Sequence, residues 1–183
     1  NLYFQNPVVA HGQDPWVIRW QTNYFLCQSR RDGGAGSVWV NRAARLEDIG
    51  TNNWKCVWRP PAGTSHSKEI WAPELHFIQG KWFIYVAADD GDNAHHRMFV
   101  LENDSADPQA PFHFKGKIFA PDDHWAIDGT VLEMPDGKLF FIWSGWPDDR
   151  DGVQNLYIAP MSNPWTISGA RVCISKPRYK WES

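Results

Sequence analysis

The sequence predicts an all-β fold made of repeated antiparallel sheets, and three observations support this prediction. Helical periodicity is nearly absent, whereas short runs of Val, Ile, Phe, Tyr and Trp recur between clusters of Gly, Pro, Asn and Asp. Asp136-Gly137 supplies the tight turn of a clear hairpin between residues 130–133 and 138–143. A strand-rich unit also repeats along the chain with a period of roughly 50 to 60 residues, which is typical of propeller blades.

Each repeat is expected to form one blade of four antiparallel strands. An acidic residue precedes the first hairpin of every repeat, at Asp14, Glu74 and Asp128. Because the fourth strand of each repeat ends near a proline, the blades are expected at about 14–61, 74–121 and 128–177. A closed ring of five such blades needs about 280 residues, so the chain from 6 to 183 is expected to supply about three blades of a five-bladed β-propeller.

The composition indicates a globular protein and restricts its partners. Residues 1–5 read as the remnant of a protease-cleavable expression tag and are set aside. A hydrophobic fraction of 43% provides for a core, and a net charge of -3 gives no basic surface for nucleic acid. No apolar run approaches the roughly 18 residues that a membrane span needs. The three cysteines are odd in number and widely separated, so no disulfide framework or zinc site is predicted.

The acidic residues that head the repeats are candidates for a catalytic site. In a propeller the innermost strands of all blades start at one end of a central channel, so Asp14, Glu74 and Asp128 are expected to meet there. Converging carboxyl groups are what the cleavage of a glycosidic bond requires, one to activate water and one to protonate the leaving oxygen. Glu74 has an alternative, structural role, in which its side chain binds backbone N–H groups at the entrance of the blade.

Tryptophan is unusually frequent, and the 12 indole side chains have two competing explanations. Most of them are expected to fill the wide spaces between packed sheets. Trp16, Trp71 and Trp125 stand close to the acidic residues and are instead candidates for the walls of a sugar-binding pocket.

Two further patterns suggest metal ligands, and both are better explained without a metal. His95 and His96 are adjacent, and adjacent side chains in a strand point to opposite faces and cannot easily bind one ion. The acidic runs at 89–92 and 148–151 lack the full ligand pattern of a calcium loop, so they are interpreted as solvated loops. No metal and no cofactor are expected.

Three segments together resemble the blade openings of glycoside hydrolase family 43. They are HGQDPWVI at 11–18, WAPEL at 71–75 followed by GKWFIY at 80–85, and WAIDGTV at 125–131. The resemblance covers nearly the whole chain after the tag remnant. It implies an inverting glycosidase in which Asp14 is the general base that activates water, while Asp128 orients the general acid and adjusts the pKa of that acid.

The general acid that the resemblance implies is a glutamate opening blade four in a Glu-Gly-Pro motif, and this motif does not occur in the sequence. Glu182 does not replace it, because it directly follows Trp181, whereas Glu74 and Asp128 each stand three positions after their tryptophan. We therefore expect this chain alone to be incomplete, with the remaining blades supplied by a missing segment or by a second chain.

The resemblance implies a secreted, exo-acting α-L-arabinofuranosidase that releases terminal arabinofuranosyl residues from plant cell-wall polysaccharides or oligosaccharides. A β-xylosidase or an endo-arabinanase of the same family is an alternative, because loops outside the three motifs decide the substrate. A further alternative is a fragment without activity of its own, or a sugar-binding remnant, since the loss of general acid catalysis typically slows a reaction about 10²–10⁴-fold.

Overall fold

The computed structural model of the chain describes residues 6–31, 35–150 and 152–182. The segment interpreted as a tag remnant, 1–5, lies outside the described residues. The described chain is all-β, as the sequence predicts, and its helices are single 3₁₀ turns at η1 (Leu46–Asp48), η2 (Asn93–His95) and η3 (Lys180–Glu182). None of these helices has the length and apolar character needed to cross a membrane.

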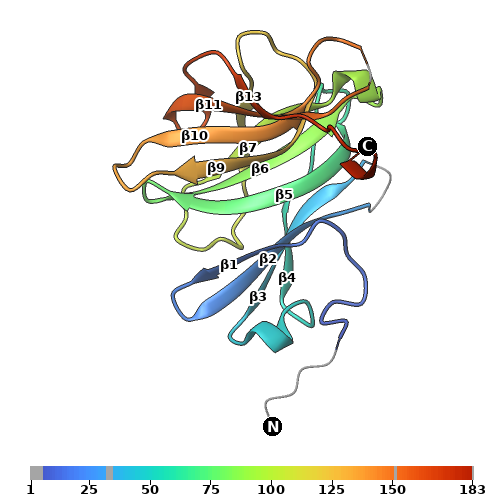
Figure 1. Cartoon of the computed structure of the whole chain (residues 1–183). Helices are drawn as coiled ribbons and strands as arrows, with labels where there is room; N and C mark the ends of the chain where they lie inside the picture. The colour runs from blue at the N-terminus through green and yellow to red at the C-terminus, as the bar shows by residue number, and fades with distance from the viewer. Residues whose placement is uncertain (1–5, 32–34, 151, 183) are drawn as a thin grey trace.

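The strands form three antiparallel sheets that follow one another along the chain (Figure 1). The first sheet contains β1 (Trp16–Trp20), β2 (Asn23–Arg30), β3 (Ser37–Ala43) and β4 (Trp54–Trp58). The second sheet contains β5 (Lys68–Ile78), β6 (Lys81–Asp89), β7 (Arg97–Asn103) and β8 (His113–Ile118). The third sheet contains β9 (Ala126–Glu133), β10 (Leu139–Gly145), β11 (Asn155–Asn163), β12 (Thr166–Ile167) and β13 (Val172–Ser175).

Within each sheet the strands pair in chain order, so the first strand lies at one edge. The third sheet has five strands because β12 and β13 both pair with β11 and share its outer edge. The sequence predicts β13 as the fourth strand of this sheet but gives no indication of the two-residue β12. The edge strand β5 contacts both β1 and β9, so the first strands of the three sheets lie side by side.

The second sheet is buried on both faces, and β6 shows how the sequence achieves this. Alternate side chains of a strand point to opposite faces. Trp82, Ile84 and Val86 pack in the core between the first and second sheets. Phe83 and Tyr85 pack in the core between the second and third sheets. The strand is therefore apolar at successive positions, which is typical of a strand covered on both sides.

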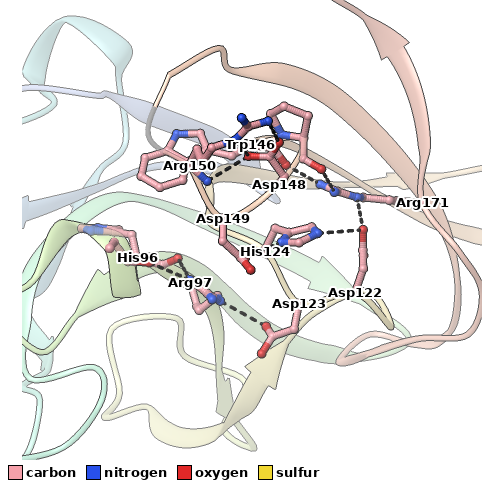
Figure 2. A network of polar contacts seen from close by, with 12 residues as sticks. His96, Arg97, Asp122, Asp123, His124, Trp146, Asp148, Asp149, Arg150 and Arg171 are labelled. Atoms are coloured by element: carbon pink, nitrogen blue, oxygen red, sulfur yellow. Dashed lines mark hydrogen bonds and ion pairs between the residues drawn. The ribbon is translucent and has the colours of Figure 1, made fainter.

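A polar network holds the segment that enters the third sheet (Figure 2). Arg171 contacts Asp122 at 2.5 Å through Nε, and its Nη1 donates to the carbonyl of Trp146 at 2.7 Å. His124 lies 2.7 Å from Asp149, between their Nδ1 and Oδ1 atoms. Because these contacts tie residues 122–124 to the loops of the third sheet, they fix the start of β9, which carries Asp128.

Candidate active site

The structure brings together the three acidic residues that the repeats single out. Asp14 lies just before β1, Glu74 lies on β5 and Asp128 lies on β9. The pKa of Asp128 is raised, first by its burial and then by the negative charges of Asp14 and Glu74. The Asp128 side chain still reaches solvent. Carboxyl groups from three successive sheets therefore share one electrostatic environment at a solvent-accessible position.

The backbone at Asp14 and Asp128 is left-handed, with φ of 48° and 52°. This conformation is uncommon for residues other than glycine and is found repeatedly at functional sites. At Asp128 it coincides with a β-bulge, since the pairing between β9 and β10 shifts register between Ile142 and Ser144. A bulge redirects a side chain away from the regular alternation of the strand. Asp128 is therefore exposed between the buried residues Ile127 and Gly129.

Gly129 is required next to Asp128 because the third sheet packs closely there. A Cβ atom at this position would lie 2.3 Å from Cζ of Phe141 and 2.9 Å from Cε of Met98. The side chain of Phe141 belongs to the core between the second and third sheets. The Asp128-Gly129 dipeptide is thus a strand position rather than the turn of a hairpin.

Glu74 lies inside β5, and not ahead of the first strand as the sequence suggests. The strand already starts at Lys68, and two register shifts interrupt its pairing with β6, one on each side of Trp71. Oε2 of Glu74 lies 2.9 Å from Nε2 of His76. The carboxylate is therefore paired with the His76 side chain, whereas the structural role expected for Glu74 involved backbone N–H groups. Burial together with the charge of Glu74 raises the pKa of the Cys27 thiol on β2.

Trp16 and Trp71 are half-buried near the acidic residues, and the ring of each packs against a histidine. The ring of Trp16 lies 4.8 Å from that of His76, and its indole N–H donates to the carbonyl of Leu75 at 2.7 Å. The ring of Trp71 lies 4.1 Å from that of His96. Both indoles keep partial exposure, which a wall of a sugar pocket requires.

Trp125 is far more buried, with 3% of its surface exposed. Its ring stacks on Trp146 at 4.8 Å and 7°, and its indole N–H donates to the carbonyl of Asn93 at 2.7 Å. It also lies 6.2 Å from the ring of His96. Trp125 therefore supports the residues around it, and its contact with a sugar stays a prediction.

Sequence reasoning missed the roles of His76, His96 and Asp89. Asp89 falls in an acidic run interpreted as a solvated loop, but only 1% of its surface is exposed, and its Oδ2 lies 2.8 Å from Nδ1 of the buried His96. His95 points elsewhere and pairs with the exposed Asp90. The signal that would have found His76 is its spacing of two from Glu74 on one strand, which places both side chains on the same face.

The residues around the site form no evident metal centre. No group of three or more His, Cys, Asp or Glu side chains is arranged to hold an ion within the part of the chain that the structure describes. The side chains gathered at the site are carboxyl groups, the His76 imidazole and aromatic rings.

Two curated relatives match nearly the whole chain. An extracellular exo-α-(1→5)-L-arabinofuranosidase of Streptomyces avermitilis is 32% identical over 185 residues, which cover 100% of this chain and 38% of that protein. Alpha-L-arabinofuranosidase 43 of Humicola insolens is 37% identical, over 98% of this chain and 37% of that protein. The chain thus spans about two-fifths of the length of these relatives.

Solved structures show the same arrangement of sheets. The α-L-arabinofuranosidase from Lactobacillus brevis has a TM-score of 0.88 and 33% identity, covering 97% of this chain and 57% of that one. An endo-arabinase from Bacteroides thetaiotaomicron, at 17% identity and a TM-score of 0.72, shares the fold. The sequence profile described as Glycosyl hydrolases family 43 matches residues 4–182. The family resemblance of the three blade-opening motifs is thereby confirmed, and the chain belongs to glycosyl hydrolase family 43.

Proposed function

We propose that this chain is the N-terminal part of an inverting, exo-acting α-L-arabinofuranosidase, with Asp14 as the general base. The observation that carries the proposal is that the charges of Asp14 and Glu74 act on Asp128 across three sheets. Asp14 is exposed just ahead of β1, where a carboxylate can activate a water molecule. Asp128, whose pKa is raised by its burial and by the charges of Asp14 and Glu74, orients the general acid and adjusts the pKa of that acid.

The general acid has to come from outside this chain, because the Glu-Gly-Pro motif is not in the sequence. In an inverting enzyme it stands roughly 6.5–9.5 Å from the base, across a gap that holds the attacking water. Glu182 is exposed and accepts hydrogen bonds from the backbone N–H groups of Arg178 and Tyr179, so it stabilises its own turn.

The outer face of the third sheet supports the proposal that further sheets complete a five-bladed ring. Val172 is 60% exposed, Ile174 is 52% exposed and Leu156 is 45% exposed, all on the paired strands β11 and β13. Apolar side chains gathered on a sheet face indicate a surface that another element covers. A fourth blade, from a continuing segment or from a second chain, fits this face and would bring the acid to the channel.

The proposed substrate is a terminal α-L-arabinofuranosyl residue of a plant cell-wall polysaccharide or oligosaccharide. The names of the relatives from Streptomyces avermitilis and Humicola insolens support arabinofuranosidase activity, and the word extracellular in the first supports secretion. Trp16 and Trp71 are proposed to stack on the sugar, and Glu74 to lie beside it. The alternatives are β-xylosidase activity and endo-arabinanase activity, and the assay described next distinguishes both from the proposed activity.

Hydrolysis of p-nitrophenyl α-L-arabinofuranoside and p-nitrophenyl β-D-xylopyranoside by the natural protein that contains this chain tests the proposal. We expect the arabinofuranoside to be cleaved with inversion, seen by NMR of the first anomer released, and Asp14→Asn to lower kcat by about 10²–10⁴-fold. Cleavage of the xyloside alone, or of internal arabinan bonds alone, would overturn the proposed substrate.

The 183-residue chain by itself is expected to be about 10²–10⁴-fold slower than the complete protein, because the leaving oxygen is not protonated. Intact mass spectrometry and size exclusion of the active material identify what completes it. A single species of 21.1 kDa with full activity would contradict the need for further blades.

A further inference from the structure

The pair formed by Glu74 and His76 has a geometry that its neighbours hold in place. The two residues stand two positions apart on β5, so their side chains point to the same face of the sheet. Nε2 of His76 and Oε2 of Glu74 lie 2.9 Å apart, and the two side chains are 12% and 19% exposed. The pair is therefore shielded from bulk solvent, but it is not sealed in the core.

Two aromatic rings clamp the imidazole of His76. Trp16 from the first sheet packs against it at a tilt, with ring centroids 4.8 Å apart and an interplanar angle of 33°. Tyr85 meets it edge-on at 5.3 Å and 78°, and the hydroxyl of Tyr85 is itself fixed by donating to the carbonyl of Pro164 at 2.7 Å. Rings held from two sides leave the imidazole little rotational freedom, so the carboxylate that binds it is also held in one orientation.

Titratable groups on four neighbouring segments surround the pair. The charge of Glu74 acts on Cys27 on β2 and on Asp128 on β9, Tyr85 on β6 contacts the ring of His76, and Asp14 ahead of β1 acts on Asp128. Burial raises the pKa of both the Cys27 thiol and the Tyr85 phenol, so these two groups stay neutral near pH 7. The charges that remain on these neighbouring groups are those of the carboxylates.

We propose that His76 is a positioning residue that holds the Glu74 carboxylate against the channel face and, when protonated, screens the charge of Glu74 from Asp128. An imidazole ordinarily carries a proton over the pH range in which carboxyl groups titrate. A cation 2.9 Å from Glu74 offsets the negative charge that Asp128 experiences. The inference rests on the proposed function in one respect only, namely that the protonation state of Asp128 affects the pKa of the general acid.

The test is the titration of Asp128, followed by NMR of ¹³C-labelled aspartate carboxyl carbons in the full protein and assigned with Asp128→Asn. Glu74→Gln removes a negative charge and should lower the pKa of Asp128, by roughly half a unit or more. If a protonated imidazole screens Glu74 as proposed, His76→Gln removes that screening charge and should raise the pKa of Asp128, by a similar amount. A purely structural role for His76 does not produce shifts of opposite sign.

The matched control is His95→Gln, which removes an imidazole paired with Asp90 in an exposed loop and should leave the titration of Asp128 unchanged. His76→Asn carries the same expectation as His76→Gln and guards against a local distortion by one substitution. Shifts of the same sign in Glu74→Gln and His76→Gln, or an unmoved Asp128 in both His76 variants, would overturn the inference. The titration is independent of turnover, so inactivity towards both nitrophenyl glycosides would refute the proposed function and leave this result standing.

Discussion

Two histidine–carboxylate pairs at the second sheet differ in geometry and in burial. Nε2 of His76 lies 2.9 Å from Glu74 on the same strand, and Nδ1 of His96, just ahead of β7, lies 2.8 Å from Asp89 at the end of β6. In the first pair the side chains are 12% and 19% exposed, whereas in the second they are 0% and 2% exposed. The two pairs therefore combine an imidazole and a carboxylate in different dielectric surroundings.

Each pair supports one of the half-buried tryptophans near the acidic residues. The ring of Trp16 packs at a tilt on His76, and Trp71 stacks on His96. Desolvation lowers the pKa of His96 and outweighs the opposing effect of Asp89, so the buried imidazole stays neutral and acts as a fixed support. The difference shows that one kind of pair is sealed in the core while the other stays within reach of solvent.

The comparison predicts its largest effect for His96→Ala. This change opens a cavity beneath Trp71 and takes away the imidazole that lies 2.8 Å from the buried Asp89 carboxylate, so the free energy of unfolding should fall by about 3–5 kcal/mol. Urea unfolding measures the loss. His95→Ala is the adjacent control, and because its side chain is 59% exposed the change should stay within about 0.5 kcal/mol. Equal losses in the two variants would show that the buried pair has no special role.

A smaller loss is expected for His76→Ala, because its surroundings admit solvent that can satisfy Glu74. The variant loses one hydrogen bond and the contacts with Trp16 and Tyr85, which together stabilise the fold by about 1–2 kcal/mol. Urea unfolding of this variant measures the loss in the free energy of unfolding. A loss as large as that of His96→Ala would contradict the distinction drawn from burial.

The smallest effect concerns the pH dependence of stability at His96. Since its folded pKa is lowered, the unfolded chain binds this proton more tightly. The stability contribution of the neutral imidazole is full above about pH 6.5 and is lost as pH falls from there through the lowered folded pKa, at no more than about 1.4 kcal/mol per pH unit. Thermal unfolding of wild type and His96→Gln between pH 7.5 and 5 measures the difference, on a scale of about 1 kcal/mol. Parallel pH profiles would show that His96 takes up no proton on unfolding.

The sequence was sufficient to predict the sheets, because strands and turns depend on local patterns. Turn residues such as Asp136-Gly137 separate apolar runs, and these patterns gave the strands around them. The spacing of Asp14, Glu74 and Asp128 placed them at the starts of repeats, and the structure brings them into one electrostatic environment. The start of β5 was misplaced, since the bulges around Trp71 interrupt the alternation that marks a strand.

By itself, then, the sequence determined the strand order, the repeat and the family, because periodicity and turn chemistry are local properties of the chain. Only the tertiary structure decided that Asp89 is buried, that Trp125 is covered by Trp146, and that His76 binds Glu74. Whether a side chain is buried, and which side chain it contacts, depend on which neighbouring segments approach it. These approaches are set by packing between sheets, which no short stretch of sequence encodes.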